Sequence, residues 1–274
     1  MKNTITYFGL PGSFSNIAAE KFNNTNDLLS CVSLEEIFQR IGKSENDLGV
    51  IPIENTLHGR VVESYDLLNK YHLFITNEVV LRINHCLLTI NNEISVDEIK
   101  SCFSHYQAFA QCENFFGKHP GIIQIIVNDT ATAARDLSKT GDSTSAVVGS
   151  KKAGEIYGLT IYKEHLENHR DNFTRFAVIS RRLKKDGEKA SILFSVKHVP
   201  GSLSHVLSSI ASKNFNLTTI ESRPIEGKPW EYRFFVDLIK PENGNFNTLV
   251  EGLEDKCESV KLLGIYSQSP VYET

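Results

Sequence analysis

Apolar residues recur along the first half of the chain with spacings that switch between two and about 3.6, a pattern that predicts strands alternating with helices. The apolar run at residues 4–8 predicts a short strand, and the glycines and proline of residues 9–12 force a turn after it. Ser13 or Ser15 is placed to cap the helix that follows. A glycine turn that leads into a helix N-terminus is a candidate anion site, although many such turns bind nothing.

A predicted buried strand at residues 48–53 ends in a polar cluster at residues 54–59, which is a second candidate site. Ligands of open α/β sheets bind at the carboxyl ends of strands, but a plain polar turn would have the same composition. Before this strand, Ser33 and Glu36 form a capping box for a helix with an apolar stripe. The pattern further predicts helices at residues 60–68, 104–116, 129–134 and 151–157, and strands at residues 78–90 and 145–149.

The segment Asn172-Phe173-Thr174-Arg175-Phe176 places a hydroxyl beside a guanidinium at the start of an apolar run that predicts a buried strand. Taken alone, it favours an ordinary strand start with an exposed Thr and Arg. Its neighbours make it a candidate site, namely the polar cluster at residues 54–59 and the pair Gln107 and Gln111, which lie one helical turn apart.

Residues 181–189 are mostly charged and predict a solvated hinge, so we expect a domain boundary there. The remaining chain predicts a βαββαβ order, which is the ferredoxin-like arrangement. Its predicted strands lie near residues 192–196, 217–223, 231–239 and 260–265, and its predicted helices at residues 203–210 and 248–253. A small sheet of this kind often covers its edge or open face by pairing with another copy.

Composition and charge argue against several classes of protein. A formal net charge of −4 disfavours a general nucleic-acid or anionic-membrane surface. The five cysteines are an odd number without a CxxC pair, which suits reduced thiols in a cytosol. The sequence has no zinc-like cluster, no apolar run long enough to span a bilayer and no secretory h-region. We therefore expect a cytoplasmic protein that binds no metal, nucleic acid or membrane.

Several separate blocks together resemble the prephenate dehydratase family with its ACT regulatory domain. The first half carries five of them, at residues 9–19, 49–61, 104–112, 129–134 and 171–176. The second half resembles the ACT domain at residues 201–207, 216–224 and 230–237. Each block is weak alone, and the resemblance depends on their joint occurrence in this order over nearly the whole chain. The chain departs from the family at Tyr106, often Pro, at His58, commonly small and polar, and at Ser202, commonly Ala.

The resemblance implies an α/β fold with a two-lobed catalytic domain similar to type-II solute-binding proteins, followed by a ferredoxin-like ACT domain. The catalytic domain would span residues 1–180, with one lobe from about 1–77 plus 164–180 and the other from about 78–163. The ACT domain would span residues 190–274. The active site would lie in the cleft between the lobes. No chorismate mutase segment precedes Met1, so we expect a monofunctional enzyme.

The resemblance also implies a reaction, in which prephenate loses CO2 and hydroxide without a cofactor to give phenylpyruvate for phenylalanine synthesis. Thr174 is the expected hydrogen-bond donor to the leaving hydroxyl, and Arg175 is expected to grip the pyruvyl carboxylate. Glu54 is an alternative ultimate acid if burial keeps it protonated, or else a structural cap. The other expected catalytic residues are Asn55, Ser104 and Gln111, and the other expected substrate-binding residues are Thr56, Gln107 and Phe176.

The family's ACT domain implies regulation by L-phenylalanine, bound at a subunit interface of a homodimer or homotetramer. The matching positions are Gly201, Ser202 and Leu203 at a helix start, and Asn216, Leu217, Thr218, Glu221 and Ser222 on the following strand. A helix N-terminus suits the carboxylate of an amino acid. The alternative is that residues 221–224 merely shape a bend.

Two rival functions remain open at this point. Arogenate dehydratase acts on the same ring with an amino acid side chain in place of pyruvyl, and sequence pattern separates the two poorly. A non-catalytic cytosolic ligand sensor would combine a solute-binding-like module with an ACT domain. An assay of phenylpyruvate formation from prephenate, repeated with arogenate, distinguishes these three.

Overall fold

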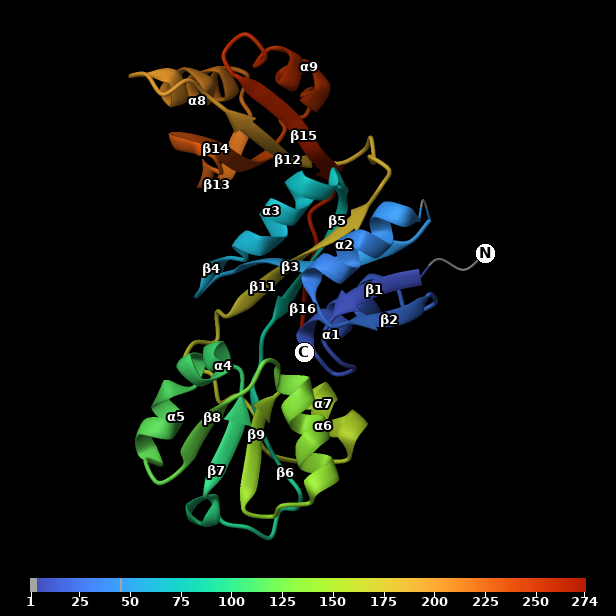
Figure 1. The fold of residues 1–274 in the computed structure, drawn as a ribbon, viewed down its shortest axis with the longest axis vertical. Coiled ribbons are helices and arrows are strands. Elements are labelled where there is room, and N and C mark those ends of the chain that lie inside the picture. The colour runs from blue at the N-terminus through green and yellow to red at the C-terminus, as the bar shows by residue number, and fades with distance from the viewer. Residues whose placement is uncertain (1–3, 45) are drawn as a thin grey trace. The chain divides into compact units, whose positions relative to one another are not determined.

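The structure is a computed structural model that describes residues 4–44 and 46–274, and its strands and helices alternate as expected for an α/β protein (Figure 1). The chain forms two compact units. The first comprises Met1–Ser64, Val79–Ala177 and Pro270–Thr274, and the second comprises Tyr65–Glu78 and Val178–Ser269. Each unit is described by itself below.

The first sheet of the first unit has the strand order β5-β11-β3-β1-β2, and β1 pairs in parallel with both β2 and β3. The bounds are β1 Thr4–Phe8, β2 Asp27–Cys31, β3 Leu48–Asn55, β4 Gly59–Arg60, β5 Phe74–Arg82 and β11 Phe173–Ser180, with helices α1 Phe14–Phe22, α2 Leu34–Lys43 and α3 Val62–Tyr71. Most of α3, the first half of β5 and the end of β11 belong to the second unit. Ser13 and Ser33 cap α1 and α2 as predicted, each accepting a hydrogen bond from the backbone N–H three residues later. Sheet and caps together fix the carboxyl ends of β1 and β3, where the polar residues stand.

The second sheet of the first unit has the order β10-β6-β9-β7-β8 and carries helices on both faces (Figure 1). The bounds are β6 Cys86–Thr89, β7 Ser101–Ser104, β8 Ile123–Ile126, β9 Ser145–Gly149, β10 Thr160–Lys163, η1 Val96–Glu98, α4 Tyr106–Gln111, α5 Glu113–Lys118, α6 Thr130–Thr140 and α7 Lys151–Tyr157. Alternate residues of β6 and β9 point to opposite faces. Leu87 and Val148 pack with α4 and α5, whereas Leu88 and Val147 pack with α6 and α7.

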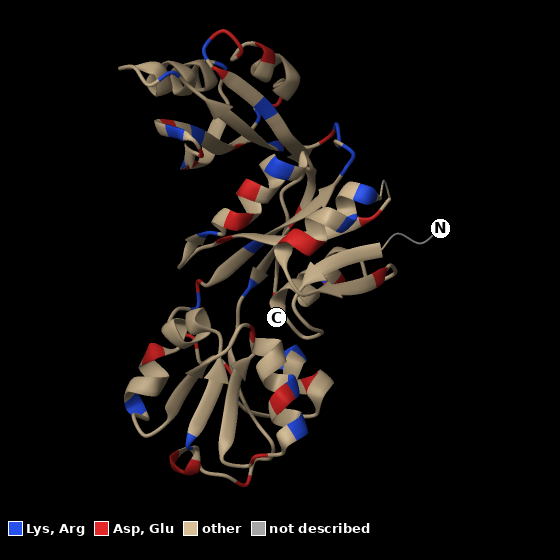
Figure 2. Ribbon diagram, viewed as in Figure 1, with Lys and Arg blue, Asp and Glu red and all other residues tan. Residues whose placement is uncertain are grey.

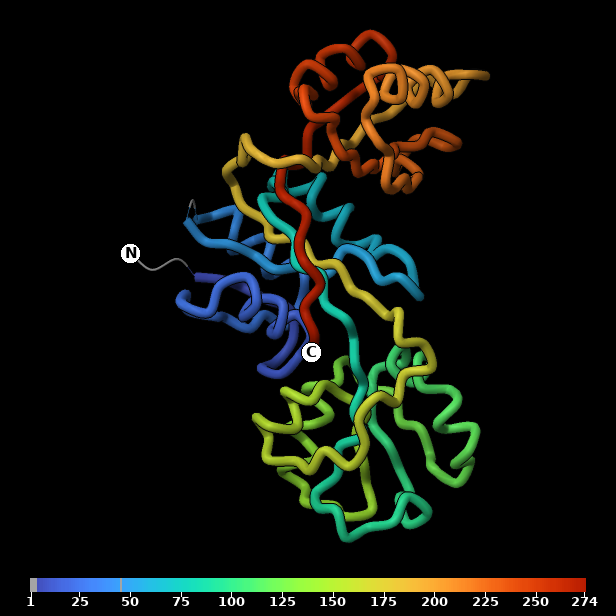
Figure 3. The backbone as a smooth tube through the Cα atoms, turned by 180° about the vertical axis from the view of Figure 1, so that it is seen from behind, coloured from blue at the N-terminus to red at the C-terminus, as the bar shows by residue number. Residues whose placement is uncertain are grey.

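The chain passes between these two sheets twice, through residues 83–85 and 164–172. The two segments are tied together because Ile83 N donates to Asn172 O at 2.8 Å and Leu166 N donates to His85 O at 2.9 Å. Near the same place, β16 (Val271–Tyr272) pairs in parallel with the end of β5, where Figure 3 shows the C-terminal segment running alongside it. The side chains carried by these connecting segments are therefore held between the two sheets.

The second unit has the predicted βαββαβ order, and its sheet runs β13-β14-β12-β15. The bounds are β12 Lys189–Ser195, α8 Ser202–Ser212, β13 Asn216–Ile225, β14 Lys228–Ile239, α9 Phe246–Glu251 and β15 Ser259–Tyr266. Gly264 of β15 pairs with Ile75 at the start of β5, and a Cβ at this glycine would lie 2.0 Å from the Ile75 carbonyl oxygen. A residue without a side chain is thus required at this strand crossing.

The fold class is confirmed, and the differences from the predicted elements are local. The sequence pattern missed β2, β4, β7, β8, β10 and β16, each of which has five residues or fewer. The alternation in β12 predicted one buried face, whereas all seven of its residues are buried. The second face is covered because Ser191 Oγ bonds to Asp237 Oδ1 and to the Tyr266 hydroxyl, so buried polar groups satisfy one another there.

Candidate active site

A cavity of about 650 Å³ lies within the first unit, between residues contributed by both of its sheets. Its lining includes the turn after β1 and the start of α1, the end of β3 with β4, the start of α4, the start of α6 and the first half of β11. Five predicted site residues line it: Asn55, Gln107, Gln111, Thr174 and Phe176. The carboxyl ends of strands therefore provide the cavity wall, as in other open α/β sheets.

Asn55 has a side-chain amide whose orientation is determined by the backbone, and the other polar groups of the cavity are assigned from it. Its side-chain oxygen accepts the backbone N–H groups of Leu57 at 2.9 Å and His58 at 3.0 Å. A backbone N–H can only donate, so these two bonds identify the Asn55 oxygen and amino group without ambiguity. The amino group then points to Thr174 Oγ1 at 3.0 Å and to the Asn172 side-chain oxygen at 2.8 Å.

The order of donors and acceptors continues from Asn55 through two more amides. Because Asn172 accepts from Asn55, its amino group is free to donate to Gln111 Oε1 at 2.9 Å. The same Gln111 oxygen lies 2.6 Å from His85 Nε2, and Gln111 Nε2 lies 3.1 Å from His58 Nδ1. Asn172 and His85 are almost fully buried, which strengthens each bond and makes an unpaired group there costly.

The alternation of β11 decides which side chains reach the cavity. Thr174 and Phe176 lie on the cavity face, and Arg175 between them lies on the other face of the strand. The Arg175 guanidinium is paired there with Glu54 Oε2, at 3.1 Å from Nε and 3.0 Å from Nη2. This pair joins β11 to β3 rather than offering either group to the cavity.

Four predicted site residues thus have structural partners and are not part of the cavity lining: Glu54, Thr56, Ser104 and Arg175. The Ser104 hydroxyl is buried and donates to Val148 O at 2.7 Å. The Thr56 hydroxyl donates to Asp171 O and accepts from Phe173 N, both at 2.9 Å. These hydroxyls hold the strands and the connecting segment that carry the cavity residues.

Sequence reasoning gave no functional role to Arg60 or His85, which belong to the cations and potential cations of the cavity. Arg60 of β4 lines the cavity with His58, His85 and His105. Figure 2 shows Lys and Arg positions interspersed with Asp and Glu positions along the helices of the first unit, so attraction of an anion depends on such local groups. Burial lowers the pKa of both His85 and His105 below the usual value for histidine, which favours the neutral imidazole.

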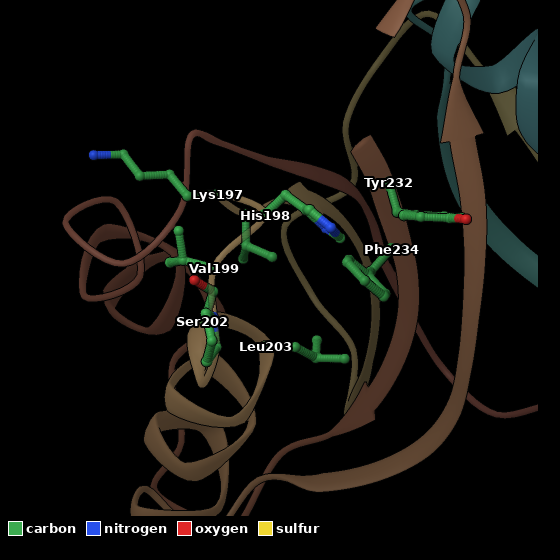
Figure 4. Close-up of a pocket in the computed structure, with 9 residues that line it drawn as sticks. Lys197, His198, Val199, Ser202, Leu203, Tyr232 and Phe234 are labelled. Carbon is green, nitrogen blue, oxygen red and sulfur yellow. The ribbon is translucent and has the colours of Figure 1, made fainter. Parts of the chain in front are cut away.

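The second unit holds a separate cavity of about 350 Å³ at the start of α8 (Figure 4). Of the predicted effector residues, Ser202 and Leu203 line it, whereas Gly201 and the five positions on β13 do not. The remaining lining comes from residues 196–200 and from the aromatic rings of Tyr232 and Phe234 on β14. Gly201 begins the helix with a φ of +86°, a conformation that glycine adopts without strain.

The described residues show no metal-binding cluster, no disulfide and no membrane-spanning helix. No group of three or more His, Cys, Asp or Glu among residues 4–44 and 46–274 could hold a metal ion. The five cysteines are free thiols, and burial raises the pKa of Cys102 to about 12, so it stays protonated. None of the described helices is both long and apolar enough to cross a membrane.

Comparison with known proteins matches both halves of the chain. The family model for prephenate dehydratase covers residues 5–184, and the model for the ACT domain covers residues 190–243. The prephenate dehydratase of Methanocaldococcus jannaschii is 34% identical, with all of both chains covered. The chloroplastic arogenate dehydratase/prephenate dehydratase 2 of Arabidopsis thaliana is 36% identical, over 96% of this chain and 72% of that protein.

Among solved structures, the prephenate dehydratase of Staphylococcus aureus subsp. aureus Mu50 is similar throughout. It superposes with a TM-score of 0.83 at 29% identity, covering 97% of this chain and 100% of that chain. The similarity confirms the fold class predicted from the sequence, with its two-lobed part and its ACT part.

Proposed function

The chain belongs to the prephenate dehydratase family, and we propose that the cavity of the first unit is where prephenate becomes phenylpyruvate, carbon dioxide and water. As a member of this family it is a carbon–oxygen lyase of L-phenylalanine biosynthesis. In the reaction the bond between ring and carboxylate breaks, and its electron pair moves into the ring as the ring–hydroxyl bond breaks. The departing hydroxide takes up one proton. Aromatisation supplies the driving force, so the enzyme mainly has to stabilise the leaving hydroxide.

Thr174 is the proposed donor to that hydroxide. Asn55 already donates a hydrogen bond to Thr174 Oγ1, so the threonine proton is available to another acceptor in the cavity. One such preorganised donor is worth about 10²–10³ in rate. An amide does not release a proton at neutral pH, so Asn55 orients Thr174 without acting as a proton relay.

The substrate carboxylate that is retained needs a different partner from the one predicted. Arg175 is paired with Glu54 outside the cavity lining, whereas Arg60 lines the cavity. Ser13, Phe14 and Ser15 at the start of α1 line it too, and a helix N-terminus favours a carboxylate. We propose that the pyruvyl carboxylate lies at Arg60 and the α1 N-terminus, with the ring against Phe14 and Phe176.

The observation that carries this proposal is the Asn55–Thr174 hydrogen bond at the wall of a cavity in a chain of this family. The test is the formation of phenylpyruvate from prephenate by the purified full-length chain. Steady turnover that saturates with prephenate supports the proposal. A chain that binds prephenate without releasing phenylpyruvate is a ligand sensor instead.

Arogenate is the second candidate substrate, because one relative is named for both activities. Arogenate carries an ammonium group next to the carboxylate, and Glu63 and Asp129 are the carboxylates in the cavity lining. The Asp129 carboxylate caps α6 by accepting from Thr132 N at 2.9 Å, which reduces what it offers a substrate. We therefore propose prephenate as the preferred substrate. A kcat/KM for arogenate above that for prephenate reverses this preference.

We further propose that L-phenylalanine regulates the enzyme through the ACT domain, in the cavity shown in Figure 4. Leu203, Tyr232 and Phe234 supply an apolar wall for a benzyl side chain, and the start of α8 suits a carboxylate. Equilibrium dialysis with labelled phenylalanine tests this, with Leu203→Asp as the variant that loses binding. Unchanged binding by that variant assigns the effector to another place, including the predicted positions on β13.

The proposed assembly is a homodimer or homotetramer. Strand β13 lies at the edge of its sheet, and its ten residues alternate between exposed and half-buried side chains. An edge of this length is a template for pairing with another copy. We also keep the predicted division into a catalytic domain at residues 1–180 and an ACT domain at residues 190–274. Light scattering with and without phenylalanine tests the assembly, and a monomer under both conditions rejects it.

A further inference from the structure

His85 stands at the end of the amide chain that orients Thr174, and nothing in the sequence pattern marked it. It lies in the connecting segment between the two sheets, with 3% of its surface exposed. Its backbone N donates to Glu167 Oε2 at 2.8 Å and its ring packs edge-on against Phe14, with ring centres 5.5 Å apart. The position of the ring is thus held by its backbone and by Phe14, in addition to the hydrogen bonds of its own nitrogens.

The protonation of His85 follows from Asn55, which lies at the other end of this series of hydrogen-bonded amides. Asn55 is fixed by two backbone N–H groups, so Asn172 presents its amino group to Gln111, and Gln111 must present its oxygen to Asn172. The same Gln111 oxygen lies 2.6 Å from His85 Nε2, so this nitrogen has to be the donor. His85 is then the Nε2–H tautomer, with Nδ1 unprotonated.

One independent fact agrees with this tautomer, and a second contact follows from the same orientation of Gln111. His85 Nδ1 is buried and has no hydrogen-bond partner among residues 4–44 and 46–274, as fits a nitrogen that carries no proton. Gln111 Nε2 is left to donate to His58 Nδ1 at 3.1 Å, which is consistent with the Gln111 oxygen facing His85 and Asn172. From Asn55 through Asn172 and Gln111 to His85, each side chain therefore has a single compatible orientation.

We propose that His85 is a positioning residue, whose Nε2–H locks the Gln111 amide and, through Asn172 and Asn55, keeps the Thr174 hydroxyl proton available to the substrate. The inference rests on the proposed function of the cavity. Without His85, the Gln111 amide loses one of the two donors that determine its orientation. Asn172 can then turn its amide, and Asn55 loses the acceptor that holds its amino group beside Thr174.

The variants His85→Leu and His85→Gln test the role of the donor. Leucine removes it, whereas the glutamine amino group can take the place of Nε2. We expect His85→Leu to lower kcat for prephenate about tenfold to a hundredfold, as for a lost buried hydrogen bond, with KM within threefold. His85→Gln should retain kcat within about threefold. Equal losses in both variants, or a loss confined to KM, would overturn the proposal.

A double-mutant cycle separates positioning from a general structural role. If His85 acts through Thr174, then His85→Leu has no further effect on kcat once Thr174→Val has removed the hydroxyl. A purely structural role predicts instead that the two losses multiply. Multiplied losses reject the assignment, even where each single variant behaves as expected.

A spectroscopic measurement tests the inference without any turnover. Nitrogen-15 spectra of histidine-labelled wild-type protein, with His85→Gln to assign the resonances, report which ring nitrogen carries the proton. We expect a protonated Nε2 and an unprotonated Nδ1 at neutral pH. A proton on Nδ1 alone would overturn the proposal. Absence of prephenate turnover with the expected tautomer would instead reject the proposed function, so the two failures are distinguishable.

Discussion

Replacing Asn55 by aspartate changes one group in the cavity from a donor to an acceptor and preserves its shape. In the native chain the Asn55 amino group faces three acceptors: the Asn172 side-chain oxygen at 2.8 Å, Thr174 Oγ1 at 3.0 Å and Phe173 O at 3.2 Å. A carboxylate in this place still accepts the N–H groups of Leu57 and His58 through its other oxygen. The perturbation therefore begins on the side that faces Asn172, Phe173 and Thr174.

The expected loss follows from what the new oxygen faces. Of the three partners, Thr174 has its own proton and can turn to donate it to the introduced carboxylate, which withdraws that proton from the substrate. Loss of one preorganised donor to a developing oxyanion costs about 10²–10³ in kcat, or about 3–4 kcal/mol. Asn172 regains a hydrogen bond to residue 55 only if its amide turns over. Its oxygen then faces Gln111 Oε1, which disrupts the series of hydrogen bonds that continues to His85.

The assay is the initial rate of phenylpyruvate formation from prephenate over a range of concentrations. We expect kcat to fall at least a hundredfold, with a much smaller change in KM. The matched control is Asn245→Asp, because Asn245 likewise accepts from the N–H groups two and three residues later, at 2.9 and 3.2 Å, but in the second unit. A kcat for Asn55→Asp within threefold of the control would refute the reasoning.

Three further predictions concern charge. Glu54→Gln removes the carboxylate that pairs with Arg175, so we expect about 1–3 kcal/mol less stability in urea unfolding and kcat within a few-fold; a kcat loss above a hundredfold would restore Glu54 as an acid. Glu78→Gln leaves Lys189, a buried partner at 2.8 Å, without its carboxylate, so we expect about 3–5 kcal/mol less stability by the same method, and a loss below 1 kcal/mol would contradict this. Burial lowers the pKa of His85, so the unfolded chain binds a proton there more readily than the folded chain does. The free energy of unfolding is therefore unaffected by this group above pH 6.5, and it decreases by up to about 1.4 kcal/mol per pH unit as the pH falls below 6.5. Urea unfolding at pH 7.5 and 5.5 should show a smaller change in His85→Gln than in wild type, and an equal change would contradict the shift.

Sequence reasoning located the cavity because its main parts are marked by local chemistry. The predicted capping residues at Ser13 and Ser33 fixed two helix starts. Asn55, His58 and Gly59 of the predicted polar cluster line the cavity, and so does the pair Gln107 and Gln111 at one helical spacing. Patterns of this kind depend on residues close in sequence, and these are what a sequence shows directly.

The alternation of a strand carried information that was not used. Thr174 and Arg175 are adjacent on a strand, so they must point to opposite faces, and a site that holds one excludes the other. The same rule separates Asn55, which lines the cavity, from Glu54, which pairs with Arg175. The prediction that Arg175 grips the same substrate as Thr174 did not take this alternation into account.

His85 was missed, and Asn172 was named only as part of its segment without a role, for a different reason. Each stands in a connecting segment, and their importance comes from partners 26 and 61 residues away at Gln111. A polar residue within or beside a predicted strand gives no sign of such a partner. Contacts of this kind appear only when both sheets are folded.

The most direct test of the central claim is kcat for prephenate in Thr174→Val. Valine keeps the branched shape of threonine and removes only the hydroxyl, and Asn55 retains its bonds to Asn172 and Phe173. We predict that kcat falls about 10²–10⁴-fold while KM changes less than threefold. A kcat within threefold of wild type, in a folded protein, would show that the Thr174 hydroxyl does not assist the departure of hydroxide.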